Sequence, residues 1–275
     1  MGTLYLVATP IGNLEDITLR ALRVLREVPL IAAEDTRTTR KLLSAHGIRT
    51  PLTSYHEHNK LTRLPHLLEH LVSQDLALVS EAGTPGISDP GYELVVGAVK
   101  QGIKVVPLPG PSVITAALAA SGLPTDRFTF VGFLPRRAGE RRRFLVELAG
   151  LRSTIIAFEA PHRLRDSLAD MMEAWGDRRI AVCREMTKLH EEVFRGTISE
   201  ALAHFVEPRG EFTLVIEGSS EKREAPAFDW QAELRRLHDE GVPPREAVAQ
   251  VAKAAGLPRR EVYREWLKLG RGLRK

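Results

Sequence analysis

The stretch SEAGTPGISDPG, residues 80–91, is the most informative part of the chain, and it follows the strand-like run 76–80. It places three glycines and two prolines within twelve residues. Glycine lets the backbone approach a ligand closely, and proline keeps a loop rigid. Two similar turns, ATPIGNL at 8–14 and LPGPS at 108–112, also follow strand-like runs. Three rigid turns after three strands predict a preorganised small-molecule site at one edge of an open α/β sheet.

The rest of the chain alternates between strand-like and helical patterns, which predicts an α/β fold. Strands are expected at 3–8, 30–33, 76–80 and 104–108, with an amphipathic helix at 17–28. A second set is expected at 128–133, 154–158, 179–184, 192–196 and 212–217, with helices at 140–149 and 163–175. We therefore expect two α/β domains, 1–121 and 122–220, followed by a polar linker at 219–226.

The C-terminal region, residues 226–275, has the pattern of a small helical domain, with helices at 229–240, 244–255 and 258–269. The turn between the last two resembles a helix-turn-helix corner, although a small bundle that packs against the body explains the pattern equally well. Residues 225–275 hold eleven Lys and Arg against seven Asp and Glu, so this tail carries the whole net charge of +4. Such a local excess favours phosphate-rich partners.

Several classes of protein and site are disfavoured. The sequence shows no signal peptide and no apolar run of membrane-spanning length, so we expect a cytoplasmic protein. The single cysteine, Cys183, predicts a buried, inert thiol. His56 and His58 lack a third ligand at a convincing interval, so no metal site is expected. Rossmann and P-loop fingerprints are also missing.

Six blocks occur in a fixed order: LYLVATPIGNLEDIT, AAEDTRTTRKLL, SEAGTPGISDPG, PGPSVITAALAASGLP, APHR and CREMTK. In this order they resemble the branch of the tetrapyrrole methylase fold family that methylates small-subunit ribosomal RNA. The resemblance covers residues 4–218, and the tail resembles that branch's C-terminal extension. It implies two α/β domains of the class III methyltransferase type, S-adenosylmethionine in the cleft between them, and a homodimer.

The same resemblance implies which residues line the cofactor. They are Ile11, Ala82, Gly83, Thr84, Ile87, Ser112, Val113, Glu159 and Met186. Many members of the family carry Gly-Asp-Pro where this chain has Gly-Thr-Pro at 83–85, so the contact made by the aspartate side chain has no counterpart here.

The implied substrate is the 2′-hydroxyl of a cytidine in the decoding region of 16S ribosomal RNA. A ribose hydroxyl is a poor nucleophile, so it needs a base or a cation within hydrogen-bond reach. The blocks peculiar to this branch supply the catalytic candidates Glu34, Asp35, Arg37, His162, Glu185 and Lys188, together with Glu81 and Arg163. The acidic members would accept the proton and the basic ones would orient the hydroxyl or hold phosphate, unless these residues only form ion pairs that brace loops.

The densest basic run is a candidate RNA contact, with a solvated helix face as its alternative. It consists of Arg136, Arg137, Arg141, Arg142 and Arg143. Two other functions remain open: methylation of a tetrapyrrole or another small molecule, and nonenzymatic nucleic-acid binding through the helix-turn-helix tail with the α/β body as a ligand sensor.

Overall fold

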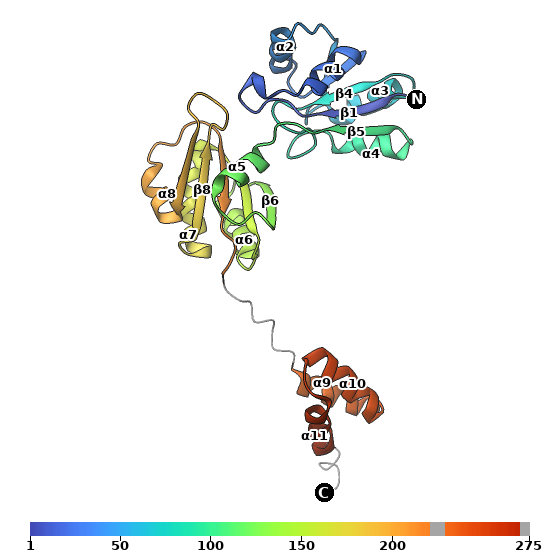
Figure 1. Ribbon diagram of the computed structural model, residues 1–275, viewed down its shortest axis with the longest axis vertical. Helices are drawn as coiled ribbons and strands as arrows, with labels where there is room; N and C mark the ends of the chain where they lie inside the picture. The colour runs from blue at the N-terminus through green and yellow to red at the C-terminus, as the bar shows by residue number, and fades with distance from the viewer. Residues whose placement is uncertain (221–228, 270–275) are drawn as a thin grey trace. The chain divides into compact units, whose positions relative to one another are not determined.

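The structure is a computed structural model that describes residues 1–220 and 229–269 (Figure 1). The chain divides into two compact units, Met1–Ser219 and Ser220–Lys275. The first unit contains two separate five-stranded sheets, and the described part of the second contains three helices. The expected fold class, two α/β sheets followed by C-terminal helices, is confirmed.

The first sheet is entirely parallel, in the order β3-β2-β4-β1-β5. Its strands are β1 (Thr3–Val7), β2 (Leu30–Ala33), β3 (Leu52–Ser54), β4 (Leu76–Val79) and β5 (Lys104–Leu108). Because all five strands run the same way, their carboxyl ends lie along one edge of the sheet. The three Gly/Pro-rich turns follow β1, β4 and β5, so they share that edge.

Helices cover both faces of this sheet, which explains why its strands are apolar on both sides. Helices α1 (Leu19–Glu27) and α2 (Thr36–Ala45) pack on one face, and α3 (Lys60–Leu71) and α4 (Tyr92–Lys100) pack on the other (Figure 1). Helix α1 begins later than the expected residue 17 because Thr18 accepts a hydrogen bond from the Ala21 N–H and caps it. A short 3-10 turn, Leu14–Asp16, precedes it.

The connections that leave β1 and β4 diverge. These two strands are neighbours, but β1 leads into α1 on one face and β4 leads into α4 on the opposite face. In an open α/β sheet, a ligand typically binds outside the carboxyl ends of strands whose connections part in this way. The topology therefore places the expected site beside the turns after β1 and β4.

The second sheet is mixed, in the order β6-β7-β10-β8-β9. Its strands are β6 (Phe128–Phe133), β7 (Thr154–Glu159), β8 (Arg179–Arg184), β9 (Glu192–Thr197) and β10 (Phe212–Ile216). Helices α6 (Ala138–Leu148), α7 (Leu164–Trp175) and α8 (Ile198–His204) cover one face. Helix α5 (Val113–Ser121) packs on the other face, although the expected boundary at 121 assigns it to the first domain.

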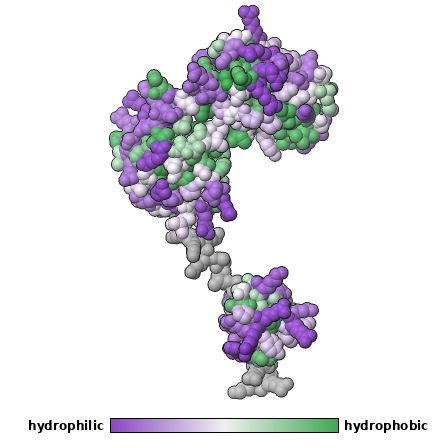
Figure 2. Space-filling model, viewed as in Figure 1, coloured by the Kyte–Doolittle hydropathy of each residue, from purple (hydrophilic) through white to green (hydrophobic). Residues whose placement is uncertain are grey.

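The described part of the C-terminal unit is built from α9 (Trp230–Asp239), α10 (Pro244–Ala255) and α11 (Arg259–Leu269), close to the three expected helices. Seven buried apolar side chains form its own core: Leu234, Leu237, Ala247, Val248, Val251, Ala252 and Val262. Its visible surface is largely hydrophilic (Figure 2). Most of the expected linker, and residues 226–228 and 270–275 of the expected domain, lie outside the described residues. No helix in the described ranges is long and apolar enough to cross a membrane.

Candidate active site

The three Gly/Pro-rich turns meet at the carboxyl edge of the first sheet. Thr9 and Gly83 exchange two backbone hydrogen bonds of 2.9 Å, which join the first turn to the second. Gly83 has φ +75°, a conformation that favours glycine. A Cβ on Gly83 would lie 3.6 Å from Ile11 Cγ2 and 3.9 Å from the Pro111 carbonyl oxygen, so the third turn approaches the same point.

The second α/β domain contacts two of these turns. A Cβ on Gly12 would lie 2.8 Å from Thr187 Oγ1 and 2.9 Å from the Met186 carbonyl oxygen, so the first turn packs against the loop after β8. A Cβ on Gly132, in β6, would lie 3.4 Å from Ser88 Oγ in the second turn. Met186 is therefore brought close to the turns that hold most of the expected cofactor-lining residues.

The chemistry of these turns suits a nucleoside-sized ligand better than a metal ion. Ala82 is exposed with little side chain in the way, and Ile87 leaves 48% of its surface exposed. Ser112 and Val113 lie at the first turn of α5 and are partly exposed. Among the described residues, no group of three or more His, Cys, Asp and Glu side chains is placed to hold a metal ion.

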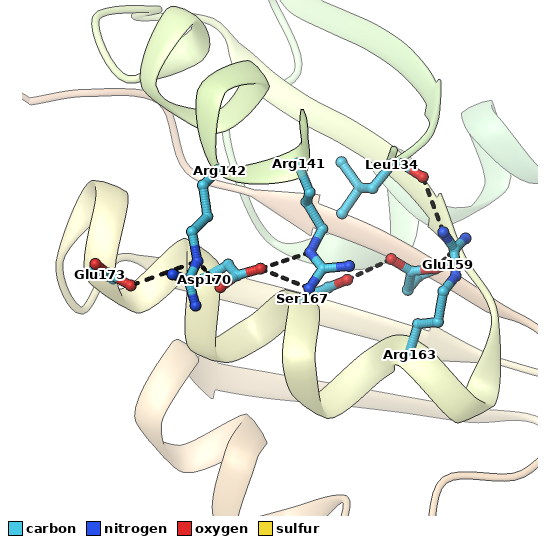
Figure 3. Close-up of polar contacts among 8 residues, drawn as sticks. All are labelled: Leu134, Arg141, Arg142, Glu159, Arg163, Ser167, Asp170 and Glu173. Atoms are coloured by element: carbon cyan, nitrogen blue, oxygen red, sulfur yellow. Dashed lines mark hydrogen bonds and ion pairs between the residues drawn. The ribbon is translucent and has the colours of Figure 1, made fainter. Parts of the chain in front are cut away.

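Glu159 has a different environment from the other cofactor candidates (Figure 3). Its side chain is fully buried, and its carboxylate accepts hydrogen bonds from the Ala160 N–H at 2.7 Å and from Ser167 Oγ at 2.5 Å. It also pairs with the Arg163 guanidinium at 2.5 Å. The side chain thus braces the turn Pro161–Arg163 and has no oxygen left over for a ligand. His162, in that turn, is exposed and has no hydrogen-bond partner within the described ranges.

The AAEDTR block follows β2 and lies next to the second turn. Glu34 accepts a hydrogen bond of 3.1 Å from the Glu81 N–H. Asp35 caps α2 by accepting from the Arg37 N–H at 2.7 Å, and it also pairs with the Arg37 guanidinium at 2.8 Å. These hydrogen bonds lower the pKa of Asp35 to about 2, which makes it a weak base. Glu34 makes no ion pair within the described residues and remains a candidate for contact with the substrate.

The REMTK block follows β8 and contains a compact ion-pair group. The Lys188 ammonium lies 3.0 Å from a carboxylate oxygen of Glu185 and 3.0 Å from one of Glu211. The Glu211 N–H donates to Glu185 at 2.9 Å, and this bond is the largest cause of the lowered pKa of Glu185. The pKa of Lys188 is raised, because these hydrogen bonds and charges outweigh its partial burial. Lys188 therefore stays protonated and acts as a hydrogen-bond donor, and Glu185 is a poor base.

Asp89, at the end of the second turn, was not among the candidates. Its pKa is raised to about 7, first by burial and also by the negative charges of Glu34 and Glu81, while a hydrogen bond from Ser80 opposes the shift. A carboxyl group that titrates near neutral pH beside a ligand site is a candidate acid or base. The only signal in the sequence is its place in the Ser-Asp-Pro-Gly end of the turn.

The arginine run has one buried member and four exposed ones, and Figure 3 draws Arg141 and Arg142 with their partners. Arg141 is only 4% exposed and pairs with Asp170 on α7 at 2.6 Å, so its assignment as an RNA contact is wrong. Arg142 is exposed but pairs with the same carboxylate at 2.8 Å. Arg136, Arg137 and Arg143 are exposed and remain candidates, although Arg137 pairs with Glu140 at 3.2 Å.

Cys183, the single cysteine of the chain, is a free thiol buried in the second domain. Burial raises the pKa of its thiol to about 11, so the thiolate is scarce at neutral pH. His56 and His58 lie with their ring centroids 6.1 Å apart on the segment before α3. Neither feature adds to the site at the carboxyl edge.

Solved structures of several methyltransferases resemble the first unit. The methyltransferase CobJ superposes with a TM-score of 0.61 at 18% identity, covering 81% of this chain and 97% of that one. Uroporphyrin-III C-methyltransferase from Thermus thermophilus, solved with S-adenosylhomocysteine, gives a TM-score of 0.57 at 20% identity, covering 78% and 97%. At these identities the likeness establishes the fold.

Sequence comparisons are more specific. The family Tetrapyrrole (Corrin/Porphyrin) Methylases matches residues 3–202, and the RsmI C-terminal HTH domain matches residues 224–270. Ribosomal RNA small subunit methyltransferase I of Halalkalibacterium halodurans is 51% identical over 95% of this chain and 93% of the relative. The Bacillus subtilis protein of the same name is 48% identical over 96% and 93%.

A shorter relative of the same name, from Thermotoga maritima, is 51% identical over 79% of this chain and 99% of its own length. About a fifth of this chain therefore has no counterpart in it. The nearly full-length identities and the two family matches agree with the two sheets and the helical tail described above. The chain thus belongs to the tetrapyrrole methylase family and, within it, to the ribosomal RNA small subunit methyltransferase I family.

Proposed function

We propose that the chain transfers a methyl group from S-adenosylmethionine to the 2′-oxygen of a cytidine in the decoding region of 16S ribosomal RNA. The observation that carries this function is identity of about half over nearly the whole chain with enzymes named ribosomal RNA small subunit methyltransferase I. The convergence of three rigid turns at the carboxyl edge supplies a site suited to the cofactor.

The turns after β1, β4 and β5 would hold the cofactor, largely through backbone. We assign this role to Ile11, Ala82, Gly83, Thr84, Ile87, Ser112, Val113 and Met186. The Glu159 side chain is assigned to positioning, because its carboxylate is used by Ala160, Arg163 and Ser167. When bound, S-adenosylmethionine supplies an electrophilic methyl carbon on a positively charged sulfur.

The chain's own residues must align the ribose hydroxyl with that carbon and take its proton. We assign proton acceptance to the carboxyl pair Glu34 and Asp89, which lies beside the second cofactor turn, with His162 as the alternative base. Lys188 stays protonated and faces the first turn, so it is assigned to orient the hydroxyl or a neighbouring phosphate. Asp35 and Glu185 are assigned to bracing, together with Arg37.

The exposed residues Arg136, Arg137 and Arg143 are assigned to the RNA backbone. We also propose that the chain works as a homodimer on small ribosomal subunits in the cytoplasm. Two apolar side chains with an unusually large exposed surface, Leu19 at 86% and Leu189 at 92%, are available for contact between copies. Light scattering on the purified chain tests the dimer directly.

The proposal is tested by offering S-adenosylmethionine with a labelled methyl group and two acceptors in parallel. One acceptor is the small ribosomal subunit that lacks the modification, and the other is a tetrapyrrole such as uroporphyrinogen. Label in the ribosomal RNA alone supports the proposal. Label in the tetrapyrrole alone would replace it with small-molecule methylation, and cofactor binding without transfer to either would leave a nonenzymatic role.

A further inference from the structure

Helix α11 carries an exposed stripe that the proposed active site does not use. Val262 faces the core of the C-terminal unit, with Trp266 and Leu269 packed against it. The opposite side of the helix presents Arg260, Tyr263, Arg264 and Leu267, spaced at i, i+3, i+4 and i+7 along one face. All four are exposed, and the two apolar members leave 48% (Tyr263) and 46% (Leu267) of their surface open.

The charges on this stripe are not neutralised. Arg260 and Arg264 make no hydrogen bond or ion pair within residues 229–269, the described part of the unit. By contrast, Arg236 on α9 pairs with Glu233 and Glu240. The acidic residues of α11, Glu261 and Glu265, fall on its other side, where Glu265 pairs with Lys268.

Further cations lie at the corner between α10 and α11. Lys253, near the end of α10, and Arg259, at the start of α11, flank a depression of about 480 Å³. Gln250 lines it as well, so the depression offers two cations and an amide. Helix α11 follows that turn, and in a helix-turn-helix the second helix is the one that contacts nucleic acid.

We propose that this stripe binds single-stranded ribosomal RNA, with Arg260 and Arg264 on phosphates and Tyr263 stacked on an unpaired base. The proposal rests on the proposed function and names the surface that docks its substrate. An aromatic side chain placed between two arginines matches the way proteins bind single-stranded RNA, where bases stack on aromatic faces and cations follow the backbone. The opposite face of α11 packs against the core of the unit, whereas the stripe is free for a partner.

The charge distribution along the chain favours RNA binding by the C-terminal unit. Because residues 225–275 hold the whole net positive charge, the first 224 residues are neutral overall and gain little long-range attraction to RNA. The C-terminal unit has its own core, so it can bind without contributing to the chemistry. Substitutions in the stripe would therefore change the affinity for the small ribosomal subunit and leave the rate of the methyl transfer step unchanged.

The test uses the full chain and four variants: Arg260→Ala with Arg264→Ala, Tyr263→Ala, Tyr263→Phe, and Lys268→Ala as the control. Lys268→Ala removes one positive charge from the same helix, but from a residue that is paired with Glu265. Binding to a single-stranded RNA oligonucleotide of the decoding region is measured by fluorescence anisotropy over a range of salt concentrations. The values of KM and kcat for unmodified small subunits are measured alongside.

We expect Tyr263→Ala to weaken RNA binding by about ten-fold and Tyr263→Phe to keep it, because stacking is worth about 1–3 kcal/mol per base. The double arginine variant should reduce the slope of log affinity against log salt by about 1.4, or about 0.7 for each lost phosphate contact on a single strand. KM for the subunit should rise by a similar factor with kcat and cofactor affinity unchanged, and Lys268→Ala should match the wild type.

Two results would overturn the inference. One is a set of stripe variants that bind RNA with the affinity and salt dependence of Lys268→Ala. The other is loss of binding together with a lower mass by light scattering, which would make the stripe a contact between copies of the chain. Failure of the proposed function is distinguishable, because then the wild type itself would not label subunits at saturating concentration.

Discussion

Asp89 provides a sharp test of the electrostatics at the carboxyl edge. Its pKa is about 7 in the folded chain, against 3.8 for an unperturbed aspartate. The folded state therefore binds more protons than the unfolded state between these two values, so stability falls as pH rises through that window. Above pH 7 the ionised carboxylate lies partly buried near Glu34 and Glu81, and Asp89→Asn removes that charge while keeping the shape.

The change in free energy of unfolding depends on how much of the interval between the two pKa values of Asp89 the experiment covers. Between pH 5 and pH 8 there are about two pH units over which Asp89 is protonated in the folded state and ionised in the unfolded state. Each such unit lowers the free energy of unfolding by about 1.36 kcal/mol. Water reaches part of the carboxyl and screens it, so we reduce the sum to about 1.5 kcal/mol. Asp89→Asn should therefore gain about 1.5 kcal/mol in free energy of unfolding relative to wild type on going from pH 5 to pH 8.

The assay is urea unfolding followed by far-UV circular dichroism at both pH values, on wild type and variant in parallel. Other titrating groups cancel because they are common to both proteins. Asp35→Asn is the matched control: its pKa of about 2 makes its contribution present at both pH values, so it should destabilise the chain equally at pH 5 and pH 8. A difference between Asp89→Asn and wild type that does not change with pH would refute the reasoning.

Three further predictions concern other parts of the first unit. Asp170→Ala leaves the buried guanidinium of Arg141 without its partner and should cost about 3–5 kcal/mol, seen as a lower urea midpoint. Gly12→Ala places a Cβ against the facing loop and should weaken cofactor binding by calorimetry, whereas Gly139→Ala, with open space around its Cβ, should not. Lys188→Met should lower kcat by about a hundred-fold while leaving the pH at half-maximal rate unchanged, because Lys188 stays protonated; a shifted pH profile would contradict its role as a donor.

The sheet strands were well predicted from the sequence, because buried strands in this fold are short apolar runs that end in Gly/Pro-rich turns. Nine strands were found within about one residue of their expected ends. The tenth, β3 (Leu52–Ser54), has only three residues, too few to show any periodicity. Helix α5 was not predicted, because its apolar residues indicate a buried segment but do not show which sheet it packs on.

The site residues were harder to predict, because their environments depend on contacts distant in the sequence. Arg141 resembles its neighbours in a solvated basic run, and only the fold reveals Asp170, 29 residues later, as its buried partner. The pKa of Asp89 is raised first by burial and then by the charge of Glu34, which follows strand β2 far earlier in the chain. Such long-range pairs leave no local pattern, whereas the three Gly/Pro-rich turns were recognisable because their glycines and prolines are local requirements of the backbone.

The most direct test of the central claim is to map the methyl group after reaction with unmodified small ribosomal subunits. Labelled RNA is digested, the modified nucleotide is located, and its ribose is distinguished from its base by resistance of the adjacent phosphodiester to alkaline hydrolysis. We predict label on the 2′-oxygen of one cytidine in the decoding region of 16S ribosomal RNA. Label on a base, on a different nucleotide, or on no RNA at all while S-adenosylmethionine still binds would contradict the account.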